Sequence, residues 1–90
     1  MTIERETERA ALKLASVEFV RKAFGETSSY RDAAGRHFIL GDEGSTILAG
    51  GRSVVEAWHN AIRRAEQSNV QTFQSYYAAN ESRLIGGIDA

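Results

Sequence analysis

The chain contains no cysteine, no proline, few aromatic residues and no long apolar run. Without cysteine it has no disulfide framework, no thiol nucleophile and no thiolate metal site. No apolar segment approaches the roughly 20 residues of a transmembrane helix, and residues 1–8 are too charged for a signal peptide. We therefore expect a cytoplasmic protein that does not contact membranes.

Neither sign of charge dominates the chain. Eleven lysine and arginine residues against 12 aspartate and glutamate residues give a net charge of −1. This balance argues against a strongly basic nucleic-acid binder and against a strongly acidic DNA mimic. With 42% hydrophobic and 26% charged residues, the 90 residues are typical of a soluble globular protein, and we expect one domain over residues 1–90.

Residues 3–24 contain neither glycine nor proline and predict one long helix, capped by Thr2 and ended by Gly25. Its apolar residues form two stripes at helical spacing, and we expect the stripe with Leu14, Val17 and Phe24 to face the core. The second stripe contains Leu12 and Phe19. It either packs against another side of the core or forms an interface with a partner or a second copy.

Three short strands follow, over residues 28–32, 36–40 and 46–49. The second is the clearest, because it is rich in aromatic and β-branched residues, and a glycine-containing turn at residues 41–44 leads to the third. The first is the least secure. So small a meander must pack against helices to be stable.

Ser53-Val54-Val55-Glu56 has the pattern of a capping box, in which the Ser53 hydroxyl accepts from the Glu56 amide. The weak helix formers at residues 67–69 predict a break, with Asn69 as the cap of a second helix. One helix of about 30 residues is the alternative. The predicted fold is therefore α+β: an N-terminal helix, a three-stranded antiparallel meander and two C-terminal helices.

The expected core lies where the helices meet the sheet, with the single tryptophan at its centre. Tyr76 and Tyr77 point about 100° apart on a helix, so we expect Tyr77 to pack inward and Tyr76 to be partly exposed. The predicted core residues are Leu14, Val17, Phe24, Phe38, Leu40, Ile47, Val54, Trp58, Ile62, Phe73 and Tyr77.

No group of residues has the spacing of a catalytic, cofactor or metal site. The two histidines lack the two or three further ligands that a metal needs. A Ser45, His37 and Asp42 triad would lack a nucleophile elbow and would crowd around one turn. The glycines between residues 41 and 51 match neither phosphate-binding pattern. We expect no enzyme, no cofactor and no metal.

Some exposed positions are candidates for binding a partner. Arg63 and Arg64 are neighbours on a helix, and they either contact phosphate groups or form a solvated edge of that helix. Tyr30 and Phe38 on the sheet are aromatic rings of the kind that stack on bases. An exposed tyrosine is typical of protein interfaces. The predicted partner-binding residues are Leu12, Phe19, Arg63, Arg64 and Tyr76.

One segment resembles a known class of proteins. A Phe38-Ile39-Leu40 strand, a glycine-containing turn, a strand ending Ala49-Gly50-Gly51 and a helix beginning Ser53-Val54-Val55-Glu56-Ala57-Trp58 are similar to small phage and prophage accessory proteins of the anti-defence, anti-CRISPR-like kind. The resemblance covers about residues 36–65 and implies binding to a host protein complex.

The expected function is therefore that of a non-catalytic protein-binding module. On this interpretation it is a homodimer that inhibits a host complex, such as a CRISPR effector, by steric or allosteric blocking. The alternative is a small dimeric nucleic-acid-binding regulator. Affinity for phosphates falls steeply with salt, whereas affinity through an apolar interface does not, so salt dependence separates the two.

Overall fold

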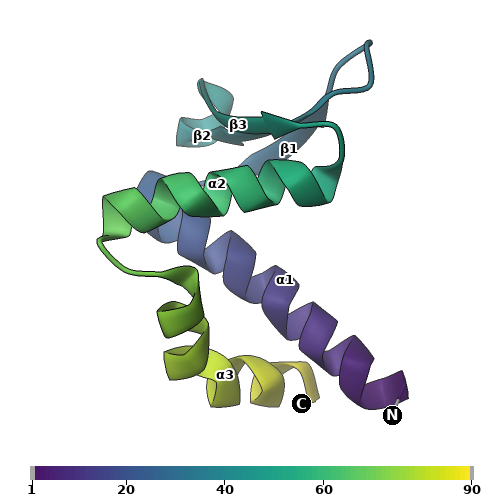
Figure 1. The fold of residues 1–90 in the computed structure, drawn as a ribbon, viewed down its shortest axis with the longest axis vertical. Helices are drawn as coiled ribbons and strands as arrows, with labels where there is room; N and C mark the ends of the chain where they lie inside the picture. Colours follow the sequence, from purple (N-terminus) through teal and green to yellow (C-terminus); the bar gives the residue numbers. More distant parts are fainter. Residues whose placement is uncertain (1, 90) are drawn as a thin grey trace.

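The computed structural model describes residues 2–89, including the side chains of residues 6–87, and its architecture is α+β (Figure 1). Within residues 2–89, no helix has both the length and the apolar content of a membrane span. The element order confirms the predicted helix, meander and two helices, while the cap expected from Thr2 lies outside the described side chains. The elements are α1 (Thr2–Phe24), β1 (Ser28–Arg31), β2 (His37–Gly41), the short 3-10 turn η1 (Asp42–Gly44), β3 (Thr46–Gly51), α2 (Val54–Asn69) and α3 (Phe73–Asp89).

The three strands pair antiparallel in the order β1-β2-β3. In the β1–β2 turn the Asp32 carboxylate accepts from the Arg36 backbone N–H at 2.9 Å, and Gly35 takes a φ of +86°, which favours glycine. A register shift follows between Ile39 and Leu40, where β2 pairs with β3. The predicted meander is confirmed, including its least secure strand.

The sheet turns a different face to the core than predicted. Ile39 is fully buried and Leu48 nearly so, while Ile47 is 61% exposed. Phe38 and Leu40 lie on the other face and are only half-buried. The prediction failed because Phe38-Ile39-Leu40 is apolar throughout, so its alternation does not indicate which face is inward.

Helix α2 packs on β2 and β3 through a stripe of three alanines, Ala57, Ala61 and Ala65, all fully buried. They recur every four residues and so share one face of the helix. The approach is close, since a Cβ added to Gly51 would lie 2.7 Å from the Ala57 nitrogen. Ser53 caps the helix as predicted, accepting from the Glu56 N–H at 3.1 Å.

Because the alanines occupy the inward face of α2, its large apolar residues lie to the side. Trp58, predicted at the centre of the core, is half-buried at its margin, as is Ile62. Val54, also predicted as core, is 42% exposed. Part of the apolar surface of α2 is therefore accessible to solvent.

Helix α1 crosses beneath α2 and runs alongside α3 (Figure 1). Its fully buried residues include Phe19 of the second stripe, which fits the alternative that this stripe packs against another side of the core. Leu14, from the stripe expected to face the core, is 41% exposed. That expectation is wrong because Ala11 and Ala15 are small, so α3 packs against them through Leu84 and sets the inward face of α1.

The second and third helices are separate, as predicted, but the break is built differently. Val70 adopts a left-handed conformation with φ 51° and ψ 42°. Thr72, not Asn69, caps α3: its hydroxyl accepts from the Ser75 N–H at 3.1 Å. The Asn69 amide instead donates to the Phe19 carbonyl at 3.2 Å, which fixes the end of α2 to α1.

Replacing Val70 with glycine is expected to raise the free energy of unfolding by about 1 kcal/mol, because a left-handed backbone strains a side chain with a Cβ. Little burial is lost, since Val70 is 90% exposed. Urea denaturation measures the change. The control Val55→Gly, in the first turn of α2, should lower stability by about 1 kcal/mol. Destabilisation of Val70→Gly would contradict the strain.

Candidate functional site

A groove of about 820 Å³ opens between α1 and α2, with a contribution from the first turn of α3. Figure 1 shows the two helices diverging from the point at which they cross. Each helix presents one stripe of residues at helical spacing to the groove. The lining comprises Arg9, Leu12, Lys13 and Ser16 from α1, Val54, Val55, Trp58, His59, Ile62, Arg63 and Glu66 from α2, and Phe73 and Gln74 from α3.

The floor of the groove is apolar and accessible. Val55 is 63% exposed and Leu12 is 43% exposed, while Trp58, Ile62 and Phe73 are half-buried. Contiguous exposed apolar residues of this kind mark binding surfaces in soluble proteins. Trp58 and Ile62, which the alanine stripe displaces to the margin of the core, form part of this floor.

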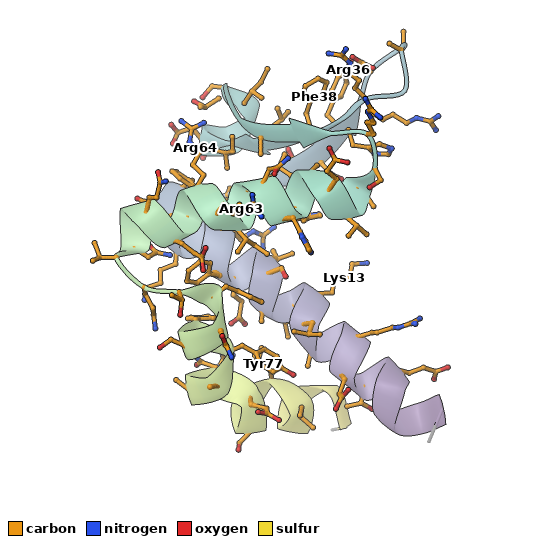
Figure 2. All side chains as sticks on the ribbon, viewed as in Figure 1. Lys13, Arg36, Phe38, Arg63, Arg64 and Tyr77 are labelled. Atoms are coloured by element: carbon orange, nitrogen blue, oxygen red, sulfur yellow. The ribbon has the colours of Figure 1, made fainter. Side chains whose placement is uncertain are left out.

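The rim of the groove is basic. Arg9 and Lys13 come from α1 and Arg63 from α2, and the described lining residues set one carboxylate, that of Glu66, against them. Figure 2 shows Lys13 and Arg63 on the two helices that flank the opening. One Glu66 oxygen already accepts from the Phe73 N–H at 2.8 Å. Among side chains 6–87, none forms an ion pair with Arg9, Lys13 or Arg63.

The predicted pair Arg63-Arg64 divides between two environments. Arg64 points away from the groove and donates to the Leu48 carbonyl at 3.0 Å. Its guanidinium also lies 5.7 Å from the centre of the Phe24 ring. Arg64 therefore fastens α2 to β3 and α1, and only Arg63 remains available to a partner.

Tyr76 also makes internal contacts rather than projecting to solvent. Its ring centre lies 5.2 Å from that of Phe19, and its hydroxyl donates to Glu18 at 2.8 Å. Arg83 forms a two-point contact with the same carboxylate, at 2.6 and 3.2 Å. These contacts join α3 to α1. Tyr77 packs inward against Phe73, with 6.4 Å between ring centres, close to its predicted role.

The electrostatics of this cluster suit a structural tie. The hydrogen bond from Arg83 holds the pKa of Glu18 below its ordinary value, against the opposing effect of burial. Burial, followed by the hydrogen bond to Glu18, raises the pKa of Tyr76. Near neutral pH the carboxylate therefore stays charged and the phenol stays protonated.

A second apolar surface lies on the face of the sheet that α2 does not cover. Tyr30 is 54% exposed there, and its ring centre lies 6.5 Å from that of Phe38, with an interplanar angle of 29°. Ile47 adds a further exposed side chain. Arg36 belongs to the same end of the molecule (Figure 2).

Of the five predicted partner-binding residues, the structure places only Leu12 and Arg63 in the groove, while Phe19 and Tyr76 contact each other in the interior. The Phe19 prediction is wrong, because a fully buried side chain cannot contact a partner. Sequence reasoning missed Lys13, Val55 and Trp58 as groove residues. The sequence of α2 does contain an indication of these residues. Three alanines at a spacing of four indicate the face that packs closely on the core, so the bulky apolar residues beside that face are expected to be accessible.

Within the described residues, no three histidine, aspartate or glutamate side chains gather as a metal site. Comparison of the chain with protein-family models, with curated proteins and with solved structures found no match. The surface geometry is therefore the basis for a functional conclusion.

Proposed function

We propose that this protein is a non-catalytic binding module that grips another protein in the groove between α1 and α2. The observation that carries the proposal is the accessible apolar floor around Trp58, Val55 and Leu12. Tryptophan and arginine are the residues that contribute most to binding at protein interfaces, and Trp58 and Arg63 lie on adjacent turns of α2.

The resemblance to phage accessory proteins supports a finer version of this function. In it the partner is a host protein complex, such as a CRISPR effector, in the cytoplasm, and binding blocks the complex sterically or allosterically. A homodimer remains part of the proposal. Phe19 is fully buried and therefore does not belong to its interface.

The test compares two aspartate substitutions at equally exposed positions. Val55→Asp places a charge on the groove floor, and Ile47→Asp places one on the open sheet face; the wild-type side chains are 63% and 61% exposed. Each tagged protein is used to capture partners from a nuclease-treated bacterial lysate, followed by mass spectrometry. We expect one stoichiometric protein that binds wild type and Ile47→Asp and loses about 90% of its capture with Val55→Asp.

Two results would contradict the proposal. Capture unaffected by Val55→Asp would mean that the groove is not the contact surface. Recovery of nucleic acid alone, abolished by nuclease, would mean that the protein-binding function itself is wrong. Circular dichroism of both variants verifies that any loss reflects binding and not unfolding.

One observation favours the second candidate, a nucleic-acid-binding regulator: the Tyr30 and Phe38 rings lie side by side on the uncovered face of the sheet. Base stacking on exposed aromatic rings is a common mode of single-strand recognition. For this function, affinity would fall steeply between about 50 and 200 mM salt, and Ile47→Asp would reduce binding more than Val55→Asp. Binding through the groove predicts the opposite order.

A further inference from the structure

Resting on the proposed function, we infer that the occupant of the groove is an amphipathic helix of the partner whose apolar face is flanked by aspartate or glutamate. The inference specifies the chemistry of the partner segment. It follows from the shape of the groove, the charges on its rim and the conflict that a second copy of this chain would meet there.

The shape matches a helix. The lining stripe of α2 runs from Val54 to Glu66, which at 1.5 Å per residue is about 18 Å along the helix axis. The three apolar anchors of an amphipathic helix, at positions i, i+3 or i+4, and i+7, span about 10 Å. The groove is therefore long enough for two turns of helix lying between α1 and α2.

The cations on the rim of the groove favour acidic residues on the flanks of that helix. Arg9 and Lys13 stand on one wall and Arg63 on the other, so a helix lying on the floor has a cation on both sides. Among the lining residues whose side chains the structure describes, Glu66 carries the only carboxylate, and one of its oxygens accepts a hydrogen bond from the Phe73 N–H. Carboxylates beside the apolar anchors of the partner would pair with these cations, whereas lysine or arginine there would be repelled.

The same charges disfavour a second copy of the chain as the occupant. In a twofold dimer each surface meets its own copy. Among the described lining residues, each copy would then bring the three cations of Arg9, Lys13 and Arg63 to the interface with only the carboxylate of Glu66 to balance them. A homodimer of this protein is therefore expected to use another surface.

The experiment selects binders from a displayed library of helical peptides with three apolar anchors and randomised flanking positions. One selection uses the wild-type protein and another uses the variant Lys13→Glu/Arg63→Glu. Both substituted side chains are exposed. Trp58 is the only tryptophan and lies in the groove, so its fluorescence measures the affinity of tryptophan-free clones directly.

We expect acidic flanks in the clones selected on wild type and basic flanks in those selected on the double variant. The double substitution should weaken an acidic clone about tenfold or more. The matched control Arg31→Glu/Arg36→Glu makes the same change in net charge at exposed residues of the β1–β2 turn region, and it should change affinity less than about twofold.

Four outcomes would overturn the inference. If Val55→Asp abolishes the binding of the selected clones but their flanking positions show no excess of acidic residues, the acidic helix is refuted while the groove remains the binding surface. Clones that also bind Val55→Asp would refute both the helix and the groove. Failure to select any clone would refute the helical occupant, with the lysate capture still deciding the proposed function. A dimer in light scattering that an acidic clone dissociates would identify the occupant as a second copy.

Discussion

The Phe19→Ala variant should lose about 3–5 kcal/mol of the free energy of unfolding, as measured by urea denaturation. Phe19 is fully buried, and its ring lies 5.6 Å from Phe73 and 5.2 Å from Tyr76, centre to centre. It joins α1 to α3 and also belongs to the cluster under α2 and the sheet. Truncation would leave a cavity where three elements meet, and the rigid surroundings can fill only part of it.

This loss is large for a chain of this size. Domains of 90 residues are stable by about 4 to 14 kcal/mol, so the variant would approach the threshold of folding. The control is Leu12→Ala on the same helix, where a 43% exposed side chain should give a change below about 1 kcal/mol.

If Phe19 were an interface residue, the opposite result would be expected. An interface phenylalanine would leave the monomer as stable as before and would change the molecular mass in light scattering. Equal, small losses for Phe19→Ala and Leu12→Ala would therefore contradict the buried position of Phe19.

Replacing Leu84 with alanine should cost about 2–4 kcal/mol and should loosen the C-terminal half of α3 from α1. Leu84 is 1% exposed and forms a small cluster with Ala11 and Ala15. Both neighbours are methyl side chains without the reach to fill the space that Leu84 would vacate. The contacts of Phe19 hold the start of α3, and the pair of Glu18 with Arg83 is largely exposed on the arginine side and contributes little alone.

Hydrogen exchange measures this effect by element. Amides of α3 should lose protection more than those of α2, because α2 is also held by the sheet. Ser82→Ala, at an exposed position two residues away, is the control and should change stability by less than about 0.5 kcal/mol. Uniform loss of protection across the chain would mean that α3 does not open separately.

Local signals in the sequence were sufficient for the element order. The Ser53 cap, the glycine-containing turns and the weak helix formers before Val70 each act within a few residues, and the structure contains an element boundary at each. The strand faces were not predictable in the same way. In Phe38-Ile39-Leu40 every residue is apolar, and only the docking of α2 decides that Ile39 is buried.

The groove was beyond sequence reasoning for a related physical reason. Its walls come from residues 9–16, 54–66 and 73–74, and their meeting depends on the angle at which α1 and α2 cross. That angle is set by which side chains pack between the helices. The sequence placed Leu12 and Arg63 on exposed faces, but nothing in their local pattern indicated that the two faces adjoin.

The alanine stripe of α2 couples the evolution of the core to the evolution of the proposed binding surface. Ala57, Ala61 and Ala65 determine how near the helix lies to the sheet and, through that distance, how far Trp58 and Ile62 reach over the groove. A lineage in which a bulkier residue entered the stripe would lift the helix and reshape the surface presented to partners. Substitutions of these three buried alanines would thus alter recognition without changing any residue that contacts the partner.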